Sequence, residues 1–346
     1  MSRADALTRN FPENGMKLLL ELPGNVRDLL ALTGEDLVQE IDLDRMRLVS
    51  GTFITSEYRH RASDVVLVAP YQGAPASRRR LMIIILIEHQ SEPDPLMPLR
   101  MVDYVTQIFR RQERRWRARH GRSRAGFRLT PVLPVVFHTG TRSWKQVGTL
   151  PDLVRAGERY RRFTPVMECL FVNLPAIPAR TLERHGGFLG WVLHLVQARR
   201  SRPAVFSRLL DRVVQRVKSM PEQDRERGEQ LLSFMYNFVY LERDEAEKRR
   251  LLARIEAAAW SEDHRRELKR MGKTIAEALR EEGHAEGFVE SARSTLLRLL
   301  RKRFGAVPQA IADRIEGTFD LEQLTTWLDR FVTAESLEEM EIEAKG

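Results

Sequence analysis

The sequence predicts an α/β fold whose second half is mainly helical. Runs of β-branched and apolar residues, bounded by Gly, Pro and other turn signals, occur before residue 178 and indicate strands. After Pro178 the apolar residues have helical spacing, as in FLGWVLHLV and LLSFMYNFVYL. At 346 residues the chain is long for one domain, so we expect a main domain with a helical addition.

The first half is predicted to follow the order α-β-β-β-α-β-β. It opens with a leucine-rich helical segment, residues 17–32, which Pro23 and Gly24 should break into two pieces. A helix that begins near Pro98 separates the third strand from the fourth, and its helical spacing of apolar residues indicates that one side packs on the sheet. The strands are predicted at residues 47–59, 64–69, 81–90, 131–138 and 168–174.

Three domains are expected along the chain, and they span residues 11–178, 179–290 and 291–342. The last is predicted to be a small helical bundle. A basic amphipathic helix runs from Thr295 to Phe304 and ends at Gly305, a residue that favours the conformation found after a helix C-terminus. Asp320 and Gln323 form a capping-box pattern, so a second helix should begin there.

Positive charge is concentrated in one segment of the chain. The net charge is +9, and residues 110–128 contain nine arginines and one glutamate. Such a segment is either a solvated helix face or a phosphate-binding surface. Because guanidinium groups bind phosphate in a bidentate manner, arginines interleaved with Trp116 and His120 favour a nucleic acid as the partner. The arginines expected to contact the DNA backbone here are Arg110, Arg111, Arg114, Arg115 and Arg117.

Several classes of protein are excluded by composition. A single cysteine, Cys169, rules out an intramolecular disulfide and a cysteine-based zinc site, and its apolar surroundings suggest a small buried hydrophobe. The N-terminus lacks the apolar core of a signal peptide. The longest apolar run, Leu81 to Ile87, is far shorter than the ~20 residues that span a bilayer. We therefore expect a cytoplasmic protein that does not enter a membrane.

Two acids and an amide are predicted to meet on one face of a hairpin. If the strands at 64–69 and 81–90 pair in antiparallel fashion around the midpoint of their loop, facing residue numbers should add up to about 152. Asp64 then lies opposite Glu88. Because side chains alternate along a strand, Gln90 shares the face of Glu88 and His89 points the other way.

Opposed carboxylates suggest a divalent metal site. Two acids at this separation repel unless a cation lies between them, and oxygen ligands suit Mg²⁺. A metal held in this way could activate water and stabilise a phosphodiester transition state. Acids at the two ends of neighbouring strands are also common where any hairpin leaves a core, so spacing alone leaves a purely structural role open.

Three segments of the chain resemble one known family. EYRHRASDVVLVAP, LIEHQSEPDPLMPLRMVDYVTQIF and LPVVFHTG are similar, in order and spacing, to the recombination-promoting nucleases, also described as YhgA-like putative transposases, of the PD-(D/E)XK nuclease superfamily. The resemblance implies a restriction-endonuclease-like αβββαβ core and Mg²⁺-dependent DNA cleavage. It also implies that Asp64 and Glu88 bind metal and that Gln90 stands in the place of the superfamily lysine.

The combined interpretation is a metal-dependent DNA endonuclease linked to recombination or transposition. Asp64 and Glu88 are expected to bind Mg²⁺ and Gln90 to position the attacking water, while Arg100 begins the next helix close enough to contact phosphate. Weak sequence preference is expected, and tight recognition would require a partner or a homodimer. Two alternatives remain, namely a catalytically silent DNA-binding protein on the same scaffold and a protein-interaction or regulatory factor.

Overall fold

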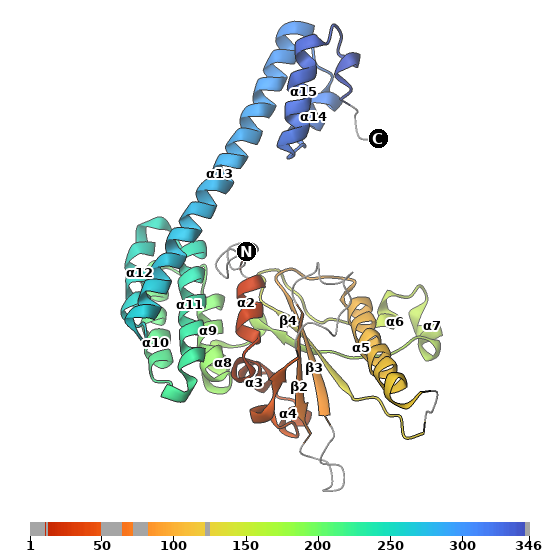
Figure 1. Ribbon diagram of the computed structural model, residues 1–346, viewed down its shortest axis with the longest axis vertical. Coiled ribbons are helices and arrows are strands. Elements are labelled where there is room, and N and C mark those ends of the chain that lie inside the picture. Colours follow the sequence, from red (N-terminus) through yellow and green to blue (C-terminus); the bar gives the residue numbers. More distant parts are fainter. Residues whose placement is uncertain (1–10, 12, 50–63, 72–81, 122–124, 343–346) are drawn as a thin grey trace. The chain divides into compact units, whose positions relative to one another are not determined.

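The structure is a computed structural model that describes residues 11, 13–49, 64–71, 82–121 and 125–342 (Figure 1). For residues 13, 14, 64, 82 and 276–287 it describes the backbone alone. Contacts between residues divide the chain into two units, Met1–Gly272 and Lys273–Gly346. The domain boundaries expected after residues 178 and 290 stay predictions.

A five-stranded mixed sheet lies at the centre of the first unit. Its strands follow the order β1-β2-β3-β4-β5, with antiparallel pairing from β1 to β3 and parallel pairing from β3 to β5. The strands are β1 (Arg47–Leu48), β2 (Asp64–Pro70), β3 (Met82–Gln90), β4 (Val132–His138) and β5 (Leu170–Asn173). The α/β class and the predicted order of elements are confirmed. Residues 50–59 of the first predicted strand lie outside the described residues.

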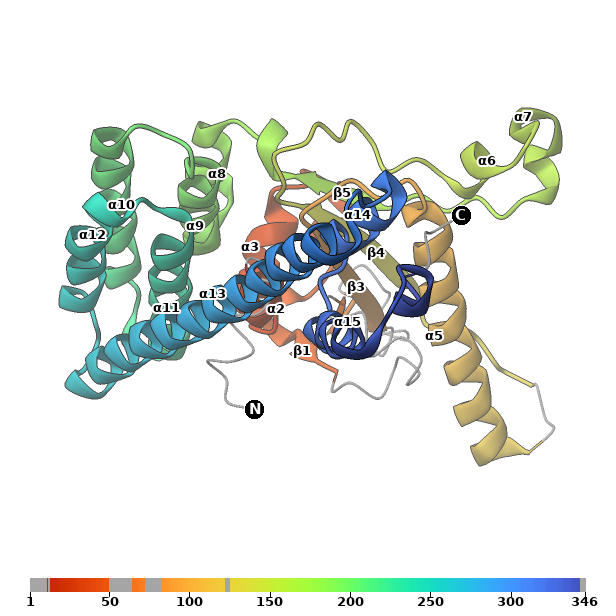
Figure 2. The ribbon, with the colours of Figure 1, turned by 90° about the horizontal axis from the view of Figure 1, so that it is seen from above.

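One face of the sheet is covered by the long helix α5 (Met97–His120) (Figure 2). Pro98 lies in its first turn, where a missing backbone N–H costs nothing. The predicted apolar side of this helix is confirmed, because Met101, Tyr104 and Ile108 are buried against the sheet. The strand residues in the same cluster are Val66, Ile84, Leu86 and Val136. Two short helices, α6 (Leu150–Leu153) and α7 (Gly157–Tyr160), lie between β4 and β5 in the chain.

The opposite face of the sheet packs on a larger group of helices (Figure 2). Ile83, Ile85 and Ile87 of β3 point to this side, as the two-residue period of a strand requires. The predicted break near Pro23 is confirmed, because α2 ends at Leu20 and α3 begins at Pro23. The helices on this side are α2 (Glu13–Leu20), α3 (Pro23–Ala31), α8 (Ala179–His185), α9 (Gly187–Gln197), α10 (Pro203–Lys218), α11 (Arg225–Glu242) and α12 (Glu245–Ala257).

Shorter helical segments complete the first unit. A one-turn helix, α4 (Asp36–Gln39), and a 3-10 turn at Leu43–Arg45 precede β1. Further 3-10 turns occupy Arg161–Phe163, Leu174–Ala176 and Glu222–Asp224. Over the part of the chain that the structure describes, none of the helices combines the length and the apolar character needed to cross a bilayer.

The second unit is formed by α14 (Gln309–Glu316), α15 (Leu321–Thr333) and the C-terminal part of α13 (Glu262–Phe304), with a last 3-10 turn at Glu338–Met340. The predicted start of a helix at Thr295 is wrong, because α13 begins at Glu262. The intervening segment contains strong helix formers and no proline, so its glycines do not end the helix. The predicted end is confirmed, since Gly305 adopts a φ of 81°. Asp320 also caps α15, accepting hydrogen bonds from the N–H groups of Glu322 (2.9 Å) and Gln323 (3.3 Å).

Candidate active site

The register of the central hairpin is the one that the sequence predicts. All seven residue pairs of β2 and β3, from Asp64 opposite Glu88 to Pro70 opposite Met82, add up to 152. A shift by one residue would turn the whole apolar set of each strand to the other face, so burial on both faces holds this register. Glu88 therefore faces the backbone position of Asp64, whose side chain lies outside what the structure describes.

Glu88 is a fully buried acid at the end of β3. Its Oε1 accepts a hydrogen bond from Nε2 of Gln90 at 2.7 Å, so these two side chains share a face as predicted. The same oxygen forms an ion pair with Nη2 of Arg100 in the first turns of α5. Burial makes an uncompensated carboxylate costly, and Arg100 supplies the compensating charge.

Arg100 joins two acids. Its Nη1 donates to Oδ2 of Asp94 at 2.7 Å while its Nη2 contacts Glu88. The Tyr104 hydroxyl lies 3.4 Å from Nη2. Burial alone would lower the pKa of Arg100, but the attraction of Glu88 and the hydrogen bonds to Asp94 and Tyr104 prevail and raise it. The guanidinium therefore stays charged.

Asp94 was missed by the sequence analysis, although its position carried a signal. It lies in the EPDP turn just before α5, where Oδ1 accepts a hydrogen bond from the Leu96 N–H at 2.8 Å. An aspartate ahead of a helix commonly satisfies such a backbone donor. The second oxygen is then left for Arg100, six residues further along the chain. The predicted phosphate contact of Arg100 stays a prediction.

His89 faces the opposite side of the sheet, as predicted. Its Nε2 lies 2.8 Å from Oγ1 of Thr139, whose carbonyl accepts a hydrogen bond from Nη2 of Arg199 at 2.7 Å. Burial, with smaller contributions from the charges of His138 and Arg199, lowers the pKa of His89 to about 3. His138 bonds the carbonyl groups of Gln90 (3.2 Å) and Arg142 (3.0 Å). Both imidazoles thus have structural partners.

The donor set at this end of the sheet suits a hard cation only in part. Asp64 and Glu88 together offer carboxylate oxygens, and Mg²⁺ is commonly bound by one or two carboxylates plus water and substrate phosphate. Among the residues with described side chains, there is no group of three or more His, Cys, Asp or Glu placed to hold a metal. Arg100 already neutralises Glu88, so a metal would have to share or displace it.

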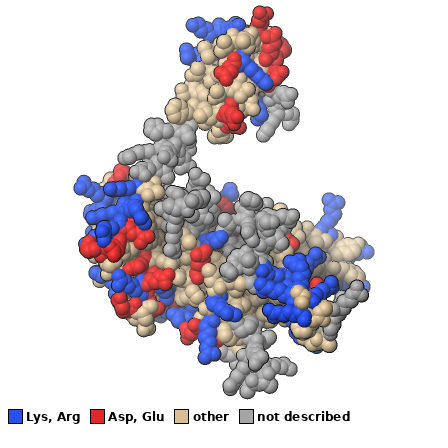
Figure 3. All heavy atoms as spheres, viewed as in Figure 1, with Lys and Arg blue, Asp and Glu red and all other residues tan. Residues whose placement is uncertain are grey.

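Apart from Arg100, the predicted DNA-binding arginines lie away from this site, along the C-terminal half of α5. Arg110, Arg114 and Arg115 are exposed, and Figure 3 shows Lys and Arg side chains gathered over this helix. Burial lowers the pKa of Arg111, and the like charges of Arg115 and Arg114 lower it further. Arg117 pairs with Glu113 at 2.6 Å. At a rise of about 1.5 Å per residue, Arg110 lies roughly 15 Å from Arg100 along the helix axis.

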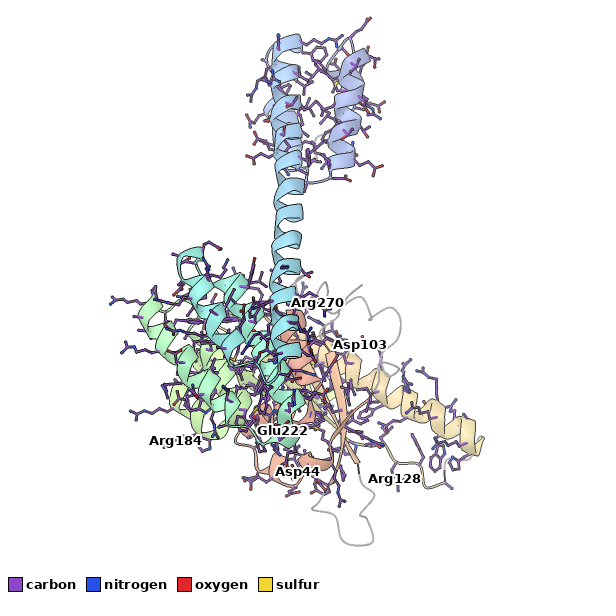
Figure 4. All side chains as sticks on the ribbon, turned by 60° about the vertical axis from the view of Figure 1, so that its left-hand side comes forward. Asp44, Asp103, Arg128, Arg184, Glu222 and Arg270 are labelled. Atoms are coloured by element: carbon purple, nitrogen blue, oxygen red, sulfur yellow. The ribbon has the colours of Figure 1, made fainter. Side chains whose placement is uncertain are left out.

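Aromatic residues stabilise the end of this basic helix. The rings of Trp116 and His120 stack with centroids 3.8 Å apart, and Phe127 packs on Trp116 at 5.5 Å. The segment that contains Arg128 returns beside α5 (Figure 4). Gln112 fixes it by accepting from the N–H of Thr130 (2.6 Å) and donating to its carbonyl (3.2 Å). The arginines are therefore carried on an ordered surface.

Two known proteins resemble part of this chain. Recombination-promoting nuclease RpnC of Escherichia coli (strain K12) is 29% identical over 128 residues, which cover 35% of this chain and 38% of that protein. Recombination-promoting nuclease RpnD of Escherichia coli O157:H7 is 28% identical over 138 residues, 39% of this chain and 48% of that protein. The chain thus spans less than half the length of these relatives, and no solved structure matches it.

The family match is broader than either of these alignments. The family described as "Putative transposase, YhgA-like" matches residues 14–227, which include the whole sheet, α5, and the helices α3, α8, α9 and α10 on the other face. This confirms the resemblance found in the sequence. The chain belongs to the YhgA-like putative transposase family.

Proposed function

We propose that this protein is a divalent-metal-dependent DNA endonuclease linked to recombination, with a restriction-endonuclease-like core. The observation that carries the proposal is the opposition of Asp64 and Glu88 at the end of the central hairpin, with Gln90 bonded to Glu88. The names of the relatives support nuclease activity in general. The basic surface of α5 supports a polyanionic substrate.

Asp64 and Glu88 would hold the metal, expected to be Mg²⁺. When bound, it would supply a water of lowered pKa and neutralise charge on the phosphate. Gln90 donates through Nε2 to Glu88, so its amide carbonyl is the group that can accept a hydrogen bond from the attacking water. An amide does not accept a proton at neutral pH, so Gln90 orients this water and the proton passes to solvent. Water attacks phosphorus, the P–O bond to the leaving sugar oxygen breaks, and that oxygen takes a proton from solvent.

The arginines of α5 would hold the DNA backbone. Arg110, Arg111, Arg114 and Arg115 lie on one helix within two turns, a spacing that can follow neighbouring phosphates. Arg117, which pairs with Glu113, would be a further contact on the same helix. Phosphate contacts carry little sequence information, and we therefore propose weak sequence preference. The homodimer stays a prediction.

The test is cleavage of supercoiled plasmid by the full chain with Mg²⁺ or with EDTA. Asp64→Asn and Glu88→Gln preserve side-chain shape and should each reduce cleavage by about 100-fold or more. The matched control is Glu92→Gln, because Glu92 is an exposed acid near the end of β3 that pairs with Arg142 at 3.3 Å. Cleavage that persists in both site variants would remove Asp64 and Glu88 from the mechanism.

A second candidate function is DNA binding without cleavage. The specific observation in its favour is the ion pair of Glu88 with Arg100, because a carboxylate already neutralised by a guanidinium has less need of a metal. In that case the wild type would bind DNA with affinity that falls steeply as salt rises, and plasmid would stay intact in Mg²⁺ and in Mn²⁺.

A further inference from the structure

Glu88 is already paired with a cation, Arg100, in the place where the proposed metal would bind. Its side chain is fully buried, and Arg100, only 18% exposed, already pairs with it. A divalent cation and a guanidinium would compete for one carboxylate, because like charges a few ångströms apart repel strongly in a poorly solvated site. The affinity of the site for metal must then depend on how readily Arg100 leaves Glu88.

The guanidinium is divided between two acids in a way that permits such an exchange. Nη2 contacts Glu88, whereas Nη1 contacts Asp94, so either contact can break while the other persists. Asp94 is itself held by the backbone of Leu96, and its side chain is 24% exposed. Its carboxylate therefore offers Arg100 a fixed position one hydrogen bond away from Glu88. A lysine ammonium is a compact point charge and could not divide itself in the same planar arrangement.

We infer that Arg100 is an exchangeable counter-ion of Glu88, and that Asp94 is the residue that receives it when a divalent cation binds. Without metal, Arg100 neutralises the buried acid and stabilises the fold. When the cation binds Glu88, Arg100 releases that carboxylate and keeps Asp94. Arg100 and Asp94 are thus positioning residues that set metal affinity. This inference rests on the proposed metal site at Asp64 and Glu88.

Removing the arginine beside the site should strengthen metal binding. In the full-length Arg100→Met protein, Mn²⁺ titrated by electron paramagnetic resonance should bind at least about tenfold more tightly than in the wild type, since the guanidinium of Arg100 no longer competes for Glu88. Asp94→Asn should weaken Mn²⁺ binding about three- to tenfold, because Arg100 then has no second carboxylate to accept it.

A double-mutant cycle separates this exchange from a simple change in local charge. If Asp94 acts through Arg100, Asp94→Asn should change the Mn²⁺ affinity by less than about twofold in the Arg100→Met background. If Asp94 is a metal ligand or only adds negative charge, Asp94→Asn should weaken Mn²⁺ binding equally in both backgrounds. Arg142→Met is the matched control, because Arg142 is an exposed arginine that pairs with Glu92 in the same region. Its Mn²⁺ affinity should stay within about twofold of the wild type.

Stability gives a readout that is independent of catalysis. Without metal, Arg100→Met should lower the melting temperature by roughly 5–10 °C, because Glu88 loses its ion pair with Arg100, and saturating Mn²⁺ should restore most of this loss. Should Arg100→Met not fold, Arg100→Lys serves instead, with expected Mn²⁺ affinity between those of the wild type and Arg100→Met. Both readouts are measured on the full chain.

The outcomes distinguish the inference from the function on which it rests. Mn²⁺ binding that disappears in Glu88→Gln but is unchanged or weaker in the Arg100 variants would overturn the inference and leave the metal site in place. Mn²⁺ binding that is unchanged in Asp64→Asn and Glu88→Gln, or absent from every protein, would overturn both. Tighter binding in Arg100→Met, together with loss of the Asp94 effect, supports the exchange.

Discussion

Two buried arginine–carboxylate clusters of the first unit resemble each other in composition and differ in role. In one, Arg227 of α11 pairs with Asp28 of α3 and donates through Nε to Oδ1 of Asn25 at 2.7 Å. In the other, Arg100 pairs with Glu88 and Asp94. The side chains of Arg227 and Asp28 are only 7% and 8% exposed, whereas those of Arg100 and Asp94 are 18% and 24% exposed.

The difference lies in what else each acid contacts. Asp28 also accepts a hydrogen bond from the backbone N–H of Leu189 at 3.0 Å, so it caps the start of α9 and joins three helices. A Cβ on Gly187, which has a φ of 54°, would lie 2.3 Å from this carboxylate. No group in that cluster can move without unpacking helices. Glu88, in contrast, lies at the end of a strand. Its partner Arg100 also contacts a second acid, Asp94.

The largest expected effect is on stability, from Arg227→Met. Losing this guanidinium leaves Asp28 buried without its main counter-ion, and we expect the free energy of unfolding in urea to fall by about 3–5 kcal/mol. Arg216→Met is the matched control, because Arg216 lies over the same Phe188 ring (4.7 Å, against 5.6 Å for Arg227) but is exposed. Arg216→Met should lower the free energy of unfolding by less than about 1 kcal/mol. Equal losses of unfolding free energy in the two variants would contradict the structural role of the buried Arg227–Asp28 pair.

The second effect separates function from stability at the other cluster. Glu88→Gln should lower plasmid cleavage by about 100-fold, which corresponds to about 2.7 kcal/mol in transition-state stabilisation, because a neutral amide is a poor ligand for a divalent cation. The free energy of unfolding should fall less than for Asp28→Asn, because Arg100 keeps its contact with Asp94, whereas Arg227 loses the carboxylate with which it pairs. If Glu88→Gln lowers the free energy of unfolding as much as Asp28→Asn does, the two clusters have the same structural role.

A third, smaller effect concerns DNA affinity. Arg114→Gln and Arg115→Gln should each weaken DNA binding several-fold and reduce the slope of log affinity against log salt by about 1. Substitutions at exposed positions of this kind should change the free energy of unfolding by no more than about 0.5 kcal/mol. Fluorescence anisotropy with a labelled duplex measures the slope. Arg208→Gln, a change to an exposed arginine of α10, is the control and should leave the slope unchanged.

The smallest effect is a pH dependence in the helical part of the first unit. Burial lowers the pKa of His264 below its ordinary value of 6.5, although Glu229 and Glu267 oppose this. The unfolded chain therefore binds a proton at a higher pH than the folded chain does. The stability is fully present above about pH 6.5 and declines as pH falls, by less than about 1.4 kcal/mol per pH unit. Urea unfolding at several pH values should show a flatter profile for His264→Gln, and an identical slope would contradict this assignment.

Much of the arrangement around the site could be predicted because it depends on local periodicity. The alternation of β3 places Glu88 and Gln90 on one face and His89 on the other, and the hairpin loop sets the pairing of Asp64 with Glu88. The apolar spacing of α5 likewise predicts which of its sides packs on the sheet. These features need only the sequence of one or two neighbouring elements.

Other features escaped prediction because they depend on contacts between distant elements. The length of α13 is an exception, because it was missed for a local reason: its glycines are weak stop signals in an otherwise helical composition. The pairing of Arg100 with Glu88 requires the end of β3 and the start of α5 to meet at a particular angle, which packing decides. The Arg227–Asp28 cluster joins residues 199 positions apart.

The sequence by itself determined the α/β class, the order of elements, the hairpin register and the segregation of arginines on one helix, because periodicity, turn residues and charge act locally. The tertiary structure alone decided which arginine is a counter-ion and which lies on the surface. That choice depends on burial, since a guanidinium beside a desolvated carboxylate is held in place, whereas the same group in water is screened and mobile. Arg100 and Arg114 are chemically identical, and their surroundings assign them different roles.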